Sequence, residues 1–189
     1  MAAILTGFLE QFLVHHVPSS EKSRHLRARL EALSRGEMSV PLVFIHGDPG
    51  PQNPVIRPDN RLALLDWENA EPAGVPLWDL VEFLLTLTVW AGRRPTLSSR
   101  LAAMREHYLE GGSLTDFIIG SVKRYRRAVA IESSLVAPLF WTHLLVQAMR
   151  ETPRFEPSKL QQGHQLKLLE LFVAQRQSAV LGQILQVGS

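Results

Sequence analysis

The chain has 189 residues, of which 46% are hydrophobic and 20% are charged, the balance of a globular protein with one sizeable core. Its formal charge is only +2 and its basic residues are dispersed, so the composition argues against a nucleic-acid-binding protein. The absence of cysteine excludes disulfide frameworks, thiolate zinc sites and cysteine nucleophiles, and it predicts a reducing, cytoplasmic location. The longest apolar stretch, residues 77–91, contains Asp79 and Glu82, so we predict no membrane span.

The N-terminal part of the sequence predicts two helices and then a strand. Apolar residues at helical spacing indicate a helix over residues 3–16, which Pro18 ends, and a second helix that runs to about Ser34. Residues 42–45 form a short β-branched and aromatic run, which is typical of a buried strand. We expect this strand to end at His46, where a loop rich in Pro and Gly begins.

A β-hairpin is predicted next in the chain. Residues 55–57, Val-Ile-Arg, and residues 62–65, Leu-Ala-Leu-Leu, flank residues 58–60, whose sequence Pro-Asp-Asn favours a tight turn. The second strand is expected to end at Asp66. The hairpin should therefore return the chain to the neighbourhood of the first loop.

The rest of the sequence is predicted to be helical. Five helical segments are predicted, which are residues 76–91, 98–110, 114–131, 134–151 and 158–185, and breaks that contain Gly or Pro separate all of them except the third from the fourth. We see no internal repeat and no domain boundary. The sequence therefore predicts a single, mostly helical α+β domain over residues 1–189 with one small β element.

Polar residues that can carry chemistry follow both predicted strands. Asp48 and Asn53 lie in the loop after the first strand, and Asp66 follows the hairpin. Phosphoryl transfer needs a carboxylate that positions the attacking hydroxyl and takes its proton, together with separate oxygen ligands for magnesium. Asp48, Asn53 and Asp66 can supply these parts if the hairpin brings them together. Each is also a common turn residue, so a purely structural loop is the alternative interpretation.

The sequence His46-Gly47-Asp48, with Asn53 five positions after Asp48, resembles the catalytic loop of the aminoglycoside phosphotransferase and choline kinase-like family. Members of that family are relatives of the protein kinases. The resemblance implies that Asp48 is the base-like catalytic residue and that Asn53 and Asp66 bind magnesium. It also implies the C-terminal lobe of a protein kinase-like fold, in which the small hairpin carries the catalytic and metal-binding loops, with ATP as cofactor.

The resemblance extends roughly over residues 1–110. Residues 76–80, Pro-Leu-Trp-Asp-Leu, are similar to the start of the family's next helix, which implies that Asp79 buttresses the catalytic loop. His46 has the position of the residue that braces this loop in kinases. We therefore interpret His46 as structural support of the site rather than as a general base.

Three apolar residues flank the expected metal ligands on the hairpin, and they are Val55, Ile56 and Leu65. They could form part of the floor beneath the base of the nucleotide, which would make them cofactor-binding residues. A role as the core of the hairpin is the equal alternative.

The resemblance also implies a part of the fold for each of three segments of the chain. Residues 1–40 are interpreted as helices that follow the hinge between the lobes, residues 41–75 as the catalytic loop and hairpin, and residues 76–189 as a helical subdomain. A nucleotide lobe with a phosphate loop and a phosphate-binding Lys is not expected, because the only Lys before the catalytic strand is Lys22, in a helical segment. Three explanations stay open: a fragment, a lobe supplied by another chain, or loss of ATP chemistry.

We therefore expect an ATP- and magnesium-dependent phosphotransferase that acts on a hydroxyl of a small polar molecule, with weak or absent activity of this chain alone. The expected partners are a nucleotide and a small hydroxylated substrate. A separate N-terminal lobe or a partner chain would be a third partner. We expect binding to neither nucleic acid nor a membrane. The alternative is a catalytically silent kinase-like module for binding or interaction. Exposed apolar surface where the missing lobe should sit would favour that alternative.

Overall fold

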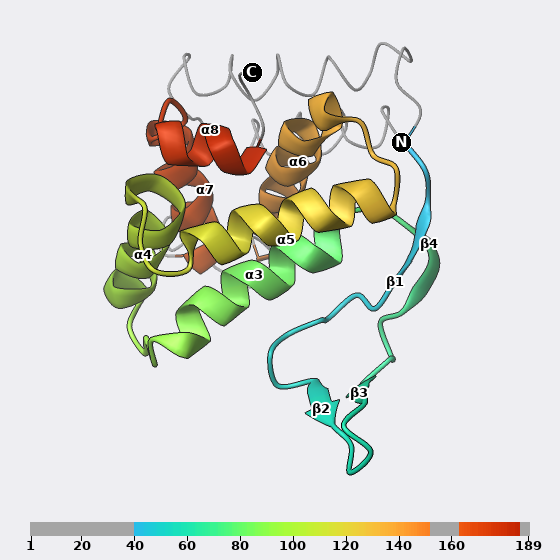
Figure 1. The fold of residues 1–189 in the computed structure, drawn as a ribbon. Helices are drawn as coiled ribbons and strands as arrows, with labels where there is room; N and C mark the ends of the chain where they lie inside the picture. Colours follow the sequence, from blue (N-terminus) through green and yellow to red (C-terminus); the bar gives the residue numbers. More distant parts are fainter. Residues whose placement is uncertain (1–39, 152–162, 186–189) are drawn as a thin grey trace. The chain divides into compact units, whose positions relative to one another are not determined.

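A computed structural model of the chain describes residues 40–151 and 163–185 (Figure 1). These residues belong to two compact units, one formed by Val40–Ile131 and the other by the described residues from Glu132 onward. The helices predicted over residues 3–16 and up to about Ser34 lie outside the described residues. The described part of the chain is mostly helical with small antiparallel sheets, which is compatible with the predicted α+β class.

The β structure of the first unit consists of two short antiparallel pairs. The pairs are β1 (Val43–Ile45) with β4 (Glu71–Gly74), and β2 (Pro54–Ile56) with β3 (Leu62–Leu64). The predicted first strand and the predicted hairpin are confirmed, with slightly shifted ends. The prediction that the first strand is buried is wrong, because Phe44 is 62% exposed and only Ile45 of β1 is buried. The sequence did not predict β4, because Pro72 and Gly74 disfavour a strand and its partner β1 lies far earlier in the chain.

The turn of the hairpin is formed by the predicted residues 58–60. The backbone N–H of Asn60 donates to the carbonyl oxygen of Arg57 at 2.9 Å, and the N–H of Arg57 donates to the carbonyl oxygen of Arg61 at 2.9 Å. Asn60 has a left-handed φ of 59°, which Asn adopts more readily than most residues. The turn chemistry therefore sets the register that returns β3 toward the loop after β1.

The helices of the first unit are α3 (Trp78–Ala91), α4 (Leu97–Arg105), the π-helical segment η1 (Glu106–Glu110) and α5 (Thr115–Ala128). The predicted helix over 98–110 is confirmed, but its last turn widens into η1. The hydroxyl of Thr96 caps α4 by accepting the N–H of Ser99. Helices α3 and α5 lie side by side (Figure 1), and both bury apolar residues, among them Leu84 on α3 and Val122 on α5.

The described helices of the second unit are α6 (Ser133–Glu151), α7 (His164–Ala174) and α8 (Ala179–Leu185). The prediction of one helix over 158–185 is wrong in the described part, because the chain breaks between α7 and α8. Phe140 of α6 is buried and contacts Trp141 and Phe172 edge to face, so it belongs to the core of this unit. No single described helix has the length and apolar composition to cross a bilayer, and α5 and α6 meet that test only when counted together.

From the buried phenol of Tyr108 in η1, we predict that the protein loses stability at alkaline pH. The side chain of Tyr108 is buried, and burial raises the pKa of its phenol well above the ordinary value, while a hydrogen bond with Thr88 offsets part of this rise. The unfolded chain releases this proton above about pH 10, whereas the folded chain keeps it. Stability is therefore full below about pH 10 and should fall as pH rises further, by about 1.4 kcal/mol per pH unit.

Urea unfolding measured at about pH 9 and about pH 11 checks this prediction. The unchanged protein should lose more unfolding free energy between the two pH values than Tyr108→Phe, which has no proton to release at this position. The same loss in both proteins would contradict the assignment of the alkaline transition to Tyr108.

Candidate functional site

The loop that follows β1 is held by a carboxylate from the start of α3. Asp79, in the first turn of α3, accepts the backbone N–H of His46 at 2.5 Å and that of Gly47 at 3.1 Å. Hydrogen bonds to an ionised carboxylate are stronger than those between neutral groups. The end of β1 is thereby fixed to the beginning of α3, which is the kind of support that the sequence analysis assigned to Asp79.

The imidazole of His46 connects the two loops that carry the candidate residues. Its side chain is buried, and its Nε2–H donates to the carbonyl oxygen of Leu65 at 2.7 Å. Its Nδ1 accepts the backbone N–H of Asp48 at 3.3 Å. A carbonyl can only accept and an amide N–H can only donate, so these two bonds define the neutral tautomer with its proton on Nε2.

Asn53 closes the loop from its other end. It is buried, and its Nδ2 donates to the backbone carbonyl of Asp48 at 2.7 Å. Its backbone carbonyl accepts the N–H of Leu65 at 3.0 Å, so the loop and the hairpin are joined by a second contact. The amide nitrogen of Asn53 is thus engaged inside the loop, and its side-chain oxygen Oδ1 is the atom that can face a ligand.

Asp66 follows Leu65 directly, and Leu65 is bonded to the first loop through both its N–H and its carbonyl oxygen. Asp66 itself is exposed and has a left-handed φ of 63°. A non-glycine residue in this conformation stores of the order of 1–3 kcal/mol of strain, and such residues cluster at functional sites. The structure therefore brings Asp66 beside the loop that contains Asp48 and Asn53.

Trp67 braces the same region, and sequence reasoning missed this role. Its ring lies 4.5 Å from the ring of His46 and 5.7 Å from that of Phe44, measured between centroids. Its indole N–H donates to the carbonyl oxygen of Leu64 at 2.7 Å. The aromatic character of Trp67 was the one available signal, but nothing in the sequence indicated His46 as its neighbour.

The donor atoms of the site suit magnesium completed by a nucleotide. Asn53 and Asp66 offer amide and carboxylate oxygens, which are the ligands that magnesium takes in proteins. Among the described residues, no group of three or more His, Cys, Asp or Glu side chains could hold a metal ion by itself. Magnesium usually keeps several of its waters and is also coordinated by phosphate oxygens of the nucleotide. Two protein oxygens are therefore enough, and a complete shell of protein ligands is not needed.

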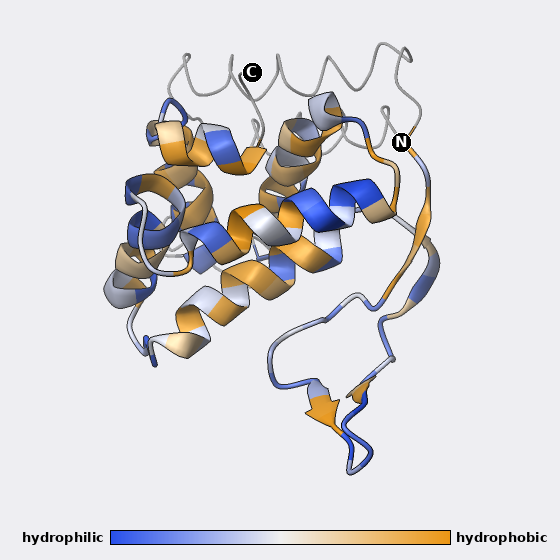
Figure 2. Cartoon of the chain, in the orientation of Figure 1, coloured by the Kyte–Doolittle hydropathy of each residue, from blue (hydrophilic) through white to orange (hydrophobic). Residues whose placement is uncertain are grey.

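The apolar residues expected beneath a nucleotide lie on the exposed hairpin, whose β2 is mostly apolar (Figure 2). The exposed fractions are 36% for Val55, 76% for Ile56 and 51% for Leu65. Side chains this exposed do not form a hairpin core, so the structure disfavours that alternative. They stay available for contact with a ligand or a partner.

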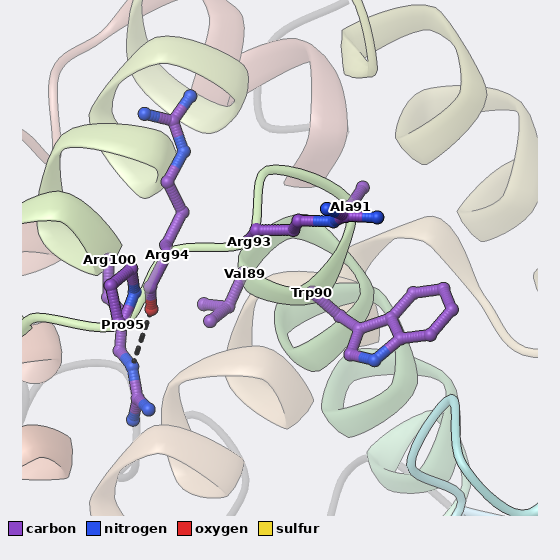
Figure 3. A pocket seen from close by; sticks show the side chains of 7 residues that line it. All are labelled: Val89, Trp90, Ala91, Arg93, Arg94, Pro95 and Arg100. Carbon is purple, nitrogen blue, oxygen red and sulfur yellow. Dashed lines mark hydrogen bonds between the residues drawn. The ribbon is translucent and has the colours of Figure 1, made fainter.

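A cavity of about 640 Å³ lies at the opposite end of α3 from Asp79. Its lining consists of Val89, Trp90, Ala91, Arg93, Arg94, Pro95 and Arg100 (Figure 3). The guanidinium groups of its three arginines point in different directions, and Arg100 instead donates to the backbone carbonyl of Arg94 at 3.1 Å (Figure 3). These side chains do not converge on one anion, and they lie at the other end of α3, whose 14 residues span about 21 Å, from the residue that holds the loop after β1.

Comparison with known proteins adds one match. A family model described as the phosphotransferase enzyme family matches residues 7–117, which is more than half of the chain. No curated protein matches the chain, and no solved structure matches it. The matched residues include the loop after β1, the hairpin and α3.

Gly47 gives a test of the geometry of this loop. It has a φ of +83°, and a Cβ added there would lie 2.2 Å from the backbone carbonyl oxygen of Asn69. Alanine in this conformation costs about 1–2 kcal/mol, and the contact with a backbone atom adds to it. Gly47→Ala should therefore lower the free energy of unfolding, measured in urea, by about 2 kcal/mol or more.

Gly120→Ala is the matched control. No atom lies within 4 Å of a Cβ added at Gly120, which is in α5. This substitution should stabilise the protein by up to about 1 kcal/mol, because alanine favours the helix. Equal effects of the two substitutions would show that the loop does not have the conformation described here.

Proposed function

The chain belongs to the phosphotransferase enzyme family, and from this premise we propose that it transfers the γ-phosphoryl group of ATP to a hydroxyl of a small polar molecule. The proposal assigns the reaction to the first unit and interprets it as part of the C-terminal lobe of a protein kinase-like fold. The observation that carries it is the imidazole of His46, which bonds to the amide of Asp48 and to the carbonyl of Leu65. That contact ties the loop of the base-like residue to the loop of Asp66.

In the proposed reaction, Asp48 accepts a hydrogen bond from the hydroxyl of the acceptor and takes its proton as the new oxygen–phosphorus bond forms. The bond from the γ-phosphorus to the oxygen that bridges to the β-phosphate breaks, and ADP leaves with that electron pair. The backbone of Asp48 is fixed on both sides, by His46 at its N–H and by Asn53 at its carbonyl. This supports the proposal, because a fixed base can hold the hydroxyl in line with the phosphorus.

Asn53 and Asp66 are the proposed magnesium ligands. Asn53 would present its Oδ1, because its Nδ2 is engaged with the carbonyl of Asp48. Asp66 would present its exposed carboxylate from the end of the hairpin. When bound, magnesium would neutralise the charge that develops on the phosphates. Both residues would orient the nucleotide relative to Asp48.

A second candidate function is a catalytically silent kinase-like module that binds a partner. It is favoured by the large apolar side chains that β1 and the hairpin expose, such as Phe44, Ile56 and Leu62, which are 62%, 76% and 67% exposed. Ile56 and Leu62 are partners in the β2–β3 pair, and exposed apolar patches on a folded protein commonly mark an interaction site. Magnesium-dependent binding of ATP separates the two candidates, because the silent module does not require it.

Asp66→Ala tests the metal site. It removes a carboxylate ligand, so the affinity for ATP in the presence of magnesium should fall by about tenfold or more. Calorimetric titration with ATP, with and without magnesium, measures this change. Asp59→Ala is the matched control, because it removes an exposed carboxylate from the turn of the same hairpin. Absence of magnesium-dependent ATP binding in the unchanged protein would contradict the proposed function.

Asp48→Asn tests the chemical step. The amide keeps the shape of the side chain but cannot take the proton, so the turnover rate should fall by about a hundredfold or more. The affinity for magnesium-ATP should stay within about threefold of the original, because Asp48 is not assigned to the metal. The turnover rate is measured with assays of phosphate release from ATP and of phosphoryl transfer. Turnover that is unchanged would remove Asp48 from its assigned role, and binding without any turnover in the unchanged protein would favour the silent module.

A further inference from the structure

The beginning of α3 is held by a residue from another helix. Leu77 precedes α3, is 1% exposed, and has a left-handed φ of 73° with no side chain capping the helix. Its backbone N–H donates to the hydroxyl oxygen of Tyr125 at 3.1 Å. A buried N–H without an acceptor costs about 1–3 kcal/mol, so this hydroxyl stabilises an unusual piece of backbone.

Tyr125 faces α3 because of its spacing along α5. It follows the buried residues Ile118 and Val122 by seven and three positions, which places it on the same face of the helix. Burial raises the pKa of Tyr125 above its ordinary value, the N–H of Leu77 lowers it, and the charge of Asp79 raises it. The phenol is therefore protonated at neutral pH and lies within electrostatic range of Asp79.

Only one residue separates Leu77 from Asp79, whose carboxylate accepts the amides of His46 and Gly47. We infer that Tyr125 is a positioning residue for phosphoryl transfer, which holds Leu77 and thereby directs the Asp79 carboxylate toward the loop that carries Asp48. This inference rests on the proposed function. Tyr125 lies outside residues 7–117, the part that the family model matches.

The conformation of Leu77 explains why the loss of the Tyr125 hydroxyl can disturb the start of α3. A left-handed conformation costs a non-glycine residue about 1–2 kcal/mol, and the surrounding contacts must outweigh this cost. Without the hydroxyl of Tyr125, Leu77 loses the acceptor of its N–H. The first turn of α3 then becomes freer to shift, and the two bonds of Asp79 to the loop weaken with it.

Tyr125→Phe tests the link without any nucleotide. Amide hydrogen exchange measured by NMR should become about fivefold faster at His46 and Gly47, which is the effect expected from losing one hydrogen bond. Tyr108→Phe is the matched control, because it deletes another tyrosine hydroxyl that lies against α3, near Thr88. Asp79→Asn should accelerate exchange at the same two amides. Unchanged exchange at His46 and Gly47 in Tyr125→Phe would overturn the inference.

The kinetic constants add a readout that general destabilisation would not produce. Tyr125→Phe should lower kcat by about fivefold with the KM for ATP unchanged, whereas Tyr108→Phe should change neither. Equal changes in both variants would overturn the inference. If the unchanged protein transfers no phosphate, the proposed function fails, and the exchange experiment alone decides whether Tyr125 holds the loop.

A measurement on the unchanged protein covers the case in which Tyr125→Phe does not fold. If Tyr125 couples these elements, the amides of Leu77, His46 and Gly47 should open together, with the same free energy of opening in native-state exchange. Clearly different opening free energies for Leu77 and for the two loop amides would overturn the inference.

Discussion

The pair of hydrogen bonds from the Asp79 carboxylate to the amides of His46 and Gly47 is the contact on which the candidate site depends. Asp79 is in the first turn of α3, where the helix dipole also favours a negative charge. The same carboxylate therefore stabilises the start of a helix and fixes the end of a strand. Because His46 and Gly47 begin the loop, the direction in which the chain enters that loop is set by α3.

His46 connects this anchored start of the loop to the other residues of the site. Its ring accepts the amide of Asp48 and donates to the carbonyl of Leu65, so the positions of Asp48 and Asp66 are not independent. Trp67 lies against the same ring and restricts its orientation. Groups that are held before a ligand arrives do not have to be ordered during the reaction, which is the physical advantage of such a network.

The sequence allowed the local parts of this arrangement to be predicted, because they depend on residues close together in the chain. The hairpin followed from its turn residues, and the loop after β1 followed from its Pro and Gly residues. Contacts between distant segments could not be predicted in the same way. The strand β4 contains Pro72 and Gly74 and forms because β1 lies beside it. The contact of Tyr125 with Leu77 joins residues 48 positions apart and has no local signal.

The two halves of the site differ in how firmly the protein holds them. His46 and Asn53 are buried and bonded on several sides, whereas Asp66 is exposed and has a strained backbone. Strain at an exposed residue persists only where neighbouring contacts outweigh it, and here those contacts are the two bonds that Leu65 makes to the loop. Under the proposed function, the buried half would define where the acceptor hydroxyl lies. The exposed half would reach its final geometry when magnesium and the phosphates bind, because their coordination supplies the constraints that the protein leaves open there.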